Sequence, residues 1–321
     1  MRFGSVGEEA SMKRIGKFNL KQYMGRLWHD MKVHKTSYLF IAPYCILFFI
    51  FTVLPVLMSI GLSFTSFNIL EPPKFVGLSN YFRLFFSDRM FTEKAIGNTF
   101  VIALIVGPVG YILCLLLAWM LNELPRVLRT ILTVVFYAPT IAGNVYLIFQ
   151  YLFNNDSQGY INAMLIRYGI TQKPILWFQD EKYMMSLIIG IALWTSIGTT
   201  FLSFIAGLQG IPKQYYEAGA IDGIRNRWQE LYYITLPSMK PQLMFGAVMS
   251  ITGGFGVGSI VTALCGLPST NYAAHTVMNH LEDYGNVRFE MGYASAIATL
   301  LFIIMVASNK IIQKLLSKVG E

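Results

Sequence analysis

The distribution of charge along the chain constrains its fold more than any other feature. Between Lys35 and Glu71 lie 35 consecutive residues without a formal charge, and five further runs follow at 95–122, 130–155, 183–212, 241–281 and 291–309. A transmembrane helix needs about 20 mostly apolar residues, so each run supplies one. The second half of 241–281 is too polar for lipid, because it contains His275, Asn279 and His280. We therefore expect an all-α integral membrane fold with six transmembrane helices, near 38–64, 96–122, 129–153, 185–208, 242–264 and 291–313.

The composition agrees with a chain that folds in a bilayer. Only 13% of the 321 residues are charged and 55% are hydrophobic, whereas soluble chains carry about 25% charged residues. The net charge of +8 does not indicate a nucleic-acid partner, because the basic residues are not interleaved with aromatic residues as in a binding module. Basic cytoplasmic flanks beside membrane lipid explain the charge more simply.

The positions of lysine and arginine predict the orientation and the domain organisation. With the N-terminus inside, the cytoplasmic segments hold 17 of the 25 Lys and Arg residues, as the positive-inside rule requires. We expect a multi-pass protein of the inner or plasma membrane with both termini in the cytoplasm. A basic tail over 1–35, without a signal-peptide cleavage site, would precede a six-span domain over 36–321. The tail suits an interfacial amphipathic helix, with a loosely ordered solvated tail as the alternative.

The residue types that are missing exclude several classes of function. The predicted spans have no Asp, Glu, Lys or Arg in their interiors, which argues against a proton- or ion-coupled transporter. The only Gly-Lys pair, Gly16-Lys17, is followed by Phe18, so the chain lacks the phosphate loop that would bind ATP. His275 and His280 lack the spacing of a metal-binding helix, and we expect them at a surface or interface. No polar cluster suits catalysis, which favours a transport subunit over an enzyme.

One cytoplasmic loop, between the fourth and fifth spans, is unusually rich in charge. Six charged residues fall within the 18 positions from Lys213 to Glu230. The sequence predicts two short helices, with a start, a left-handed end and a second N-cap at Pro212, Gly223 and Asn226. Pro237 is expected to end the second helix. Its apolar face would consist of Trp228, Leu231 and Tyr232. A helix-turn-helix with one charged and one apolar face suits docking on a partner.

The same loop resembles a motif of a known family. Glu217-Ala218-Gly219, then Gly223, then Ile234-Thr-Leu-Pro237 is similar to the EAA loop of permease subunits in binding-protein-dependent ABC importers. In that family the loop holds the coupling helix, which sits in a cleft of the ATPase subunit. The resemblance implies an ATPase-coupling site made of Glu217, Ala218, Gly219, Asp222, Gly223, Ile234, Leu236 and Pro237. Glu217 would contact a basic group on the ATPase.

Two departures from the family pattern affect this loop. The third position is Gly219 where the family usually has Ala, and the distance from Gly223 to Ile234 is one residue longer than usual. We therefore expect the second short helix to be rotated or bulged. The resemblance also implies partners: two cytoplasmic ATP-binding subunits that carry ATP and Mg, a second, homologous permease subunit, and an extracytoplasmic sugar-binding protein. No cofactor or metal is expected on this chain itself.

The substrate is expected to be a neutral polar solute, since an anion would call for a basic residue in its path. Phe75-Val-Gly-Leu-Ser-Asn-Tyr81 and Gly159-Tyr-Ile-Asn162 resemble the maltose-type, carbohydrate branch of the family, which implies import of a sugar or oligosaccharide. The candidate residues of the substrate path are neutral groups of spans three to five: Asn144, Gln150, Trp194, Ser196, Thr199, Ser250 and Thr252. Each of them also suits helix packing. The alternatives are an ABC permease for an amino acid or a phosphate ester, and a non-ABC channel.

Overall fold

The computed structural model describes residues 33–143 and 145–316, which fall into two compact units. The first unit ends at Met58 and the second begins at Ser59. All but three residues of the tail predicted at 1–35 lie outside the described residues, so its proposed amphipathic helix stays a prediction.

The first unit contains most of the first predicted span. Helix α2 (Lys35–Phe48) continues through a π-turn, η1 (Phe49–Val53), into α3 (Leu54–Leu62), whose last residues belong to the second unit. The whole run from Lys35 to Leu62 is 28 residues long, which is enough to cross a bilayer. None of its three helical pieces has a buried residue. A helix that is apolar on every side is typical of a membrane span.

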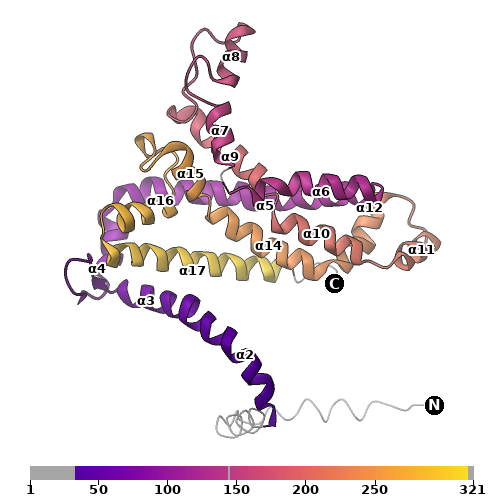
Figure 1. Cartoon of the computed structure of the whole chain (residues 1–321), viewed down its shortest axis with the longest axis horizontal. Coiled ribbons are helices and arrows are strands. Elements are labelled where there is room, and N and C mark those ends of the chain that lie inside the picture. The colour runs from indigo at the N-terminus through magenta and orange to yellow at the C-terminus, as the bar shows by residue number, and fades with distance from the viewer. Residues whose placement is uncertain (1–32, 144, 317–321) are drawn as a thin grey trace. The chain divides into compact units, whose positions relative to one another are not determined.

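The second unit is almost entirely helical (Figure 1). A two-stranded antiparallel hairpin pairs β1 (Thr65–Ser66) with β2 (Lys74–Phe75), with Thr65 opposite Phe75. The helices before the bent third span are α4 (Ser79–Phe82), η2 (Arg83–Ser87), η3 (Phe91–Ala95) and α5 (Ile96–Asn122). The bent third span and the helices after it are α6 (Arg126–Ile141), α7 (Tyr146–Leu152), α8 (Tyr160–Arg167), α9 (Glu181–Thr195), α10 (Thr199–Gly210), α11 (Lys213–Ile221), α12 (Arg227–Glu230), η4 (Leu231–Thr235), α13 (Leu236–Ser238), α14 (Lys240–Phe255), α15 (Gly258–Cys265), η5 (Thr270–Tyr272), α16 (Val277–Glu282), η6 (Asp283–Val287) and α17 (Met291–Leu316).

The predicted helical membrane fold is confirmed. Among the described residues, five helical runs are long and apolar enough to cross a bilayer: Lys35–Leu62, Phe91–Asn122, Glu181–Gly210, Lys240–Cys265 and Met291–Leu316. The predicted third span is a bent pair, α6 and α7, whose axes differ by 89°. Counting this pair as one span gives the six that the sequence predicts.

Three of the spans are interrupted, which the sequence analysis did not foresee. The third bends between Ile141 and Tyr146, the fourth has a non-helical break at residues 196–198, and the fifth breaks at Gly256 and Val257. A broken helix leaves backbone N–H and C=O groups without helical partners, and such breaks are tolerated at membrane depth only where protein or a water-filled cavity surrounds them.

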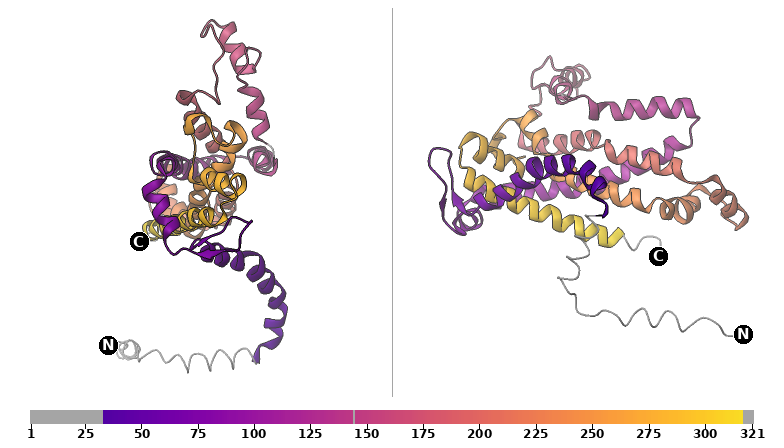
Figure 2. Two further views of the ribbon diagram at one scale, coloured as in Figure 1. Left: turned by 90° about the vertical axis from the view of Figure 1, so that its left-hand side faces the viewer. Right: turned by 60° about the horizontal axis from the view of Figure 1, so that its bottom comes forward.

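Helix α14 lies at the centre of the second unit and packs against α5, α10 and α17 (Figures 1 and 2). Glycines allow these close approaches. A Cβ atom on Gly246 would lie 2.6 Å from the Phe204 ring, and one on Gly254 would lie 3.2 Å from the Cα atom of Ala103. Since lipid is as apolar as the helices themselves, close packing of small residues holds membrane helices together.

Candidate functional site

A cavity of about 210 Å³ lies where the interrupted spans come together. It is bounded by α5, α7, α9, α14 and α15, and by residues of two breaks, Ser196 in the fourth span and Gly256 and Val257 in the fifth. We call it the break cavity. Discontinuous membrane helices commonly form the substrate sites of transporters, so the position of this cavity marks it as the candidate translocation site.

Hydroxyl groups dominate the polar lining of the break cavity. They belong to five residues: Tyr146, Thr195, Ser196, Ser250 and Ser259. Thr195 and Ser196 donate to carbonyl oxygens of their own helix, at 3.0 and 2.7 Å, which leaves their oxygen lone pairs free to accept. No described residue that lines the cavity carries a formal charge. The cavity therefore offers neutral hydrogen-bonding groups to a solute.

Two of the predicted path residues, Ser196 and Ser250, line the break cavity. The others take different positions. Gln150 donates to the carbonyl oxygen of Ala263, the Trp194 ring packs edge-on against Phe149 at 5.3 Å, and Thr199 and Thr252 have exposed side chains away from this lining. Asn144 lies outside the described residues. The substrate-path roles of all seven residues stay predictions.

Sequence reasoning missed Tyr146, Thr195 and Ser259 as lining residues. The signal that could have found two of them is the breaks themselves. Thr195 ends α9, before the break that contains Gly198, and Tyr146 begins α7, after the break that contains Gly143.

The loop between spans four and five folds as two short helices, as predicted. Pro212 precedes α11, and Gly223 ends it with φ of +94° while the Ile224 amide donates to the Gly219 carbonyl at 2.9 Å. That geometry is a left-handed helix end. The Asn226 side chain caps α12 by accepting from the Gln229 amide at 2.8 Å. We call residues 212–238 the coupling segment.

The predicted coupling residues divide into an exposed and a packed set. Glu217, Ala218, Asp222, Gly223 and Pro237 are exposed, whereas Gly219 and Ile234 are buried and Leu236 is half-buried. A Cβ atom on Gly219 would lie 2.6 Å from Cδ1 of Ile234. Glycine in place of the family's usual Ala therefore allows a close contact between α11 and η4.

Two details of the coupling segment differ from the prediction. Pro237 does not end the second helix, because the helical run continues to Ser238 and breaks at Met239. Of the predicted apolar face, only Leu231 is buried, while Trp228 and Tyr232 are 65% and 67% exposed. The expected bulge is present, since Leu231–Thr235 forms the π-turn η4.

A second cavity, of about 540 Å³, lies between the coupling segment and the ends of spans two and four. We call it the segment cavity. Arg227 stands at its edge and forms ion pairs with Glu123 at 2.9 Å and with Glu230 at 2.7 Å. These two carboxylates raise the pKa of Arg227, chiefly through the Glu230 hydrogen bond.

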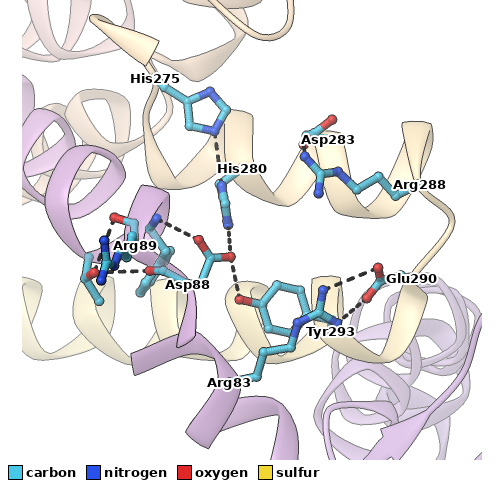
Figure 3. A network of polar contacts seen from close by, with 11 residues as sticks. Arg83, Asp88, Arg89, His275, His280, Asp283, Arg288, Glu290 and Tyr293 are labelled. Atoms are coloured by element: carbon cyan, nitrogen blue, oxygen red, sulfur yellow. Dashed lines mark hydrogen bonds and ion pairs between the residues drawn. The ribbon is translucent and has the colours of Figure 1, made fainter. Parts of the chain in front are cut away.

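A cluster of hydrogen-bonded side chains, which we call the histidine network, joins α16, α17 and the segment before α5 (Figure 3). His280 Nε2 lies 2.9 Å from Asp88 Oδ2, and the same oxygen accepts from the Tyr293 hydroxyl at 2.8 Å. His275 Nε2 lies 3.2 Å from His280 Nδ1. Both histidines are buried, at 0% and 2% exposure, so the expectation that they lie at a surface is wrong. They are packed because each ring fills a space between aromatic neighbours.

Charged residues surround the histidine network. Arg83 pairs with Glu290 and lies over the Tyr293 ring, 4.3 Å from its centroid. Arg288 pairs with Asp283 at 2.7 Å. Burial raises the pKa of the Asp88 carboxyl, but hydrogen bonds from His280, the Phe91 amide and Tyr293 outweigh it and hold that pKa well below its usual range. Burial, helped by His280, lowers the pKa of His275 to about 4. Among the described residues, no group of three or more His, Cys, Asp or Glu is placed to hold a metal ion.

Comparisons with known proteins place the chain in a family. Residues 110–318 match the model of the family described as binding-protein-dependent transport system inner membrane component. The probable ABC transporter permease protein YesP of Bacillus subtilis strain 168 is 34% identical over 284 residues, which cover 85% of this chain and 88% of that protein. The arabinooligosaccharides transport system permease protein AraP of the same strain is 31% identical over 294 residues, 90% of this chain and 91% of that protein.

Solved structures share the fold. A bacterial ABC transporter involved in the import of the acidic polysaccharide alginate matches with a TM-score of 0.71 and 24% identity, over 92% of this chain and 100% of that one. The alginate transporter in complex with an alginate pentasaccharide-bound periplasmic protein matches with a TM-score of 0.72 and 23% identity, over the same shares. The chain belongs to the binding-protein-dependent transport system inner membrane components, the permease subunits of ABC transporters.

Proposed function

We propose that this permease subunit translocates a neutral sugar or oligosaccharide into the cytoplasm. The observation that carries the proposal is the break cavity, which lies at the breaks of the fourth and fifth spans and beside the start of α7, and presents hydroxyl groups without a charged residue in its described lining. Hydroxyl groups match the donors and acceptors of a sugar, whereas an anionic solute calls for a basic residue. Relatives named for arabinooligosaccharide and lactose transport support this substrate class.

A phosphate ester is the second candidate substrate. The sn-glycerol-3-phosphate transport system permease protein UgpA of Agrobacterium fabrum is 30% identical over 280 residues, 84% of this chain and 90% of that protein. The uncharged lining of the break cavity argues against a phosphate ester, and equally against an amino acid. A non-ABC channel does not fit the family to which the chain belongs.

The proposed mechanism is alternating access driven from the cytoplasm. ATP and Mg would be held by two ATP-binding subunits that dock on the coupling segment, with the exposed carboxylate of Glu217 facing a basic group of the ATPase. A second, homologous permease subunit would complete the path through the membrane. A sugar-binding protein outside would deliver the solute, and both termini of this chain would lie in the cytoplasm. This chain would bind no cofactor itself and no nucleic acid.

One experiment tests the proposal. The tagged chain is purified in mild detergent from its host, its co-purifying proteins are identified by mass spectrometry, and the complex is reconstituted into vesicles that contain ATP. We expect a phosphate-loop ATPase and a second permease, and uptake of a neutral oligosaccharide but not of sn-glycerol-3-phosphate or an amino acid. Isolation of the chain alone would contradict the importer, and uptake of the phosphate ester alone would contradict the substrate class.

A further inference from the structure

The coupling segment is joined to the transmembrane helices across an open space. The segment cavity separates it from the ends of α5 and α10 and is lined on one side by Lys213, Tyr216 and Arg227, and on the other by Trp119, Glu123 and Leu208. Where close packing is absent, the individual contacts that cross such a space decide how a displacement of the segment reaches the spans.

One route leads to span five. Helix α11 contacts η4 through Gly219, which lies against Ile234, and through Tyr216, whose hydroxyl is 3.0 Å from Thr235 Oγ1. From η4 the chain continues through α13 into α14 with a single break at Met239. A movement of α11 therefore reaches span five through the backbone itself.

A second route leads to span two. The Arg227 guanidinium, on α12, bonds to the carboxylate of Glu123, which caps the end of α5, at 2.9 Å. One residue further along, the Trp228 ring packs on Trp119 of α5, with centroids 5.1 Å apart and planes tilted by 54°. An ion pair and a ring pair thus join the same two helices at adjacent positions. Tilted aromatic pairs of this kind stabilise beyond their buried area.

The two routes converge on the break cavity. Spans two and five pack along each other through Gly254, which approaches the backbone of Ala103, and Gly107, which approaches the backbone of Ser250. Val106 of α5 and Ser250, Gly253 and Gly254 of α14 line the break cavity. A displacement delivered to both helices moves two of its walls together.

We propose that Arg227 and Trp228 are positioning residues that carry the movement of the coupling segment to span two, so that spans two and five move as one body. This inference rests on the proposed function, because it requires an ATPase that displaces the coupling segment. The side chains of Arg227 and Trp228 would connect the coupling segment to span two, in addition to the backbone that connects it to span five.

The ion pair is exposed, with 62% and 43% of its side chains accessible, so its contribution is modest in the absence of a partner. Exposed pairs change equilibria by only about two- to fivefold. The readout must therefore be the ratio of solute imported to ATP hydrolysed, because a purely structural role would change assembly rather than this ratio.

The test uses the reconstituted complex with its binding protein. Glu230→Gln serves as the matched control and the background, because it removes the other carboxylate that Arg227 contacts within its own helix. In that background, Glu123→Arg is expected to lower the import ratio about three- to fivefold with assembly intact. The exchange Glu123→Arg with Arg227→Glu restores the ion pair in reverse and is expected to restore the ratio. Double-mutant comparisons of this kind isolate a pairwise interaction.

Each outcome decides a different question. An import ratio unchanged by Glu123→Arg, or a low ratio that the exchange does not restore, overturns the second route. If the arginine prevents assembly, the isosteric Glu123→Gln variant replaces it, and an unchanged ratio there overturns the inference equally. A wild-type complex without solute-stimulated ATP hydrolysis contradicts the proposed function itself, before any variant is compared.

Discussion

Glu217 is an exposed carboxylate on the short helix α11. Gly219, two residues on, lets α11 lie close to Ile234, and Gly223 ends the helix in a left-handed conformation. The side chain of Glu217 forms no ion pair within the described chain. A carboxylate held in this way is available to a partner.

Replacing Glu217 with Lys is expected to release or uncouple the ATPase. Reversal of a charge in a partly desolvated interface costs about 2–5 kcal/mol, so co-purification of the ATPase and solute-stimulated ATP hydrolysis should both fall. Gln214→Lys, an exposed position on the same helix, is the control and should retain both. Stimulated hydrolysis at the wild-type level in Glu217→Lys would remove this role.

The burial of His275 could not be predicted from the sequence alone. Its spacing from His280 excludes a metal-binding helix, but nothing in the spacing reveals that both rings are enclosed. Asp283, Arg288 and Asp88 influence it electrostatically, and its Nδ1 atom is buried without a hydrogen-bond partner among the described residues. Protonation would place a cation there, so the folded protein favours the neutral ring.

The stability of the complex should therefore depend on pH through His275. The pKa falls from 6.5 in the unfolded chain to about 4 in the fold, so the contribution is complete above pH 6.5 and is lost as pH falls toward 4. It amounts to about 3 kcal/mol. His275→Phe should flatten the dependence of the melting temperature on pH across this window, whatever its effect at pH 7. An equally steep dependence in the variant would contradict the assignment.

At the scale of helices, the sequence predicts the spans well and their interiors poorly. Charge-free runs locate the ends of the spans because lipid excludes charge along their whole length. The breaks escape this argument, since a bent apolar run has the same composition as a straight one. Each break nevertheless contains glycine, at Gly143, Gly198 and Gly256. The cavity residues next to the breaks were missed for the same reason.

Neighbouring glycines of α14 should respond in opposite ways to an added methyl group. Gly254→Ala places Cβ 3.2 Å from the Ala103 backbone, which must move, whereas Gly253 has nothing within 4 Å. We expect Gly254→Ala to destabilise the complex by about 1–3 kcal/mol, and Gly253→Ala to stabilise it by up to about 1 kcal/mol through helix propensity. Melting temperatures in detergent compare the two, and equal values would show that the helices do not depend on this contact.

At the scale of the whole molecule, the number of spans determines which segments share a side of the membrane. Four spans separate the N-terminus from the coupling segment, and two more separate that segment from the C-terminus. If the bent pair crosses as one span, both termini and the coupling segment would therefore lie on one side, and α8, between the third and fourth spans, would lie on the other. We predict from the charge bias of the sequence that the first side is the cytoplasm.

Labelling of single cysteines tests this topology. In a background without Cys45, Cys114 and Cys265, Tyr160→Cys in α8 and Tyr233→Cys in η4 place thiols at matched positions, since the native side chains are 60% and 65% exposed. A membrane-impermeant maleimide should label the Tyr160→Cys variant in intact cells, and the Tyr233→Cys variant only after the membrane is permeabilised. The reverse pattern would mean either that the protein is inverted in the membrane or that the bent pair α6 and α7 enters the membrane and returns instead of crossing it, which leaves the five continuous runs as spans. Labelling of both variants in intact cells would contradict the proposed fourth span, because the run Glu181–Gly210 lies between α8 and η4 and places them on opposite sides wherever it crosses the membrane.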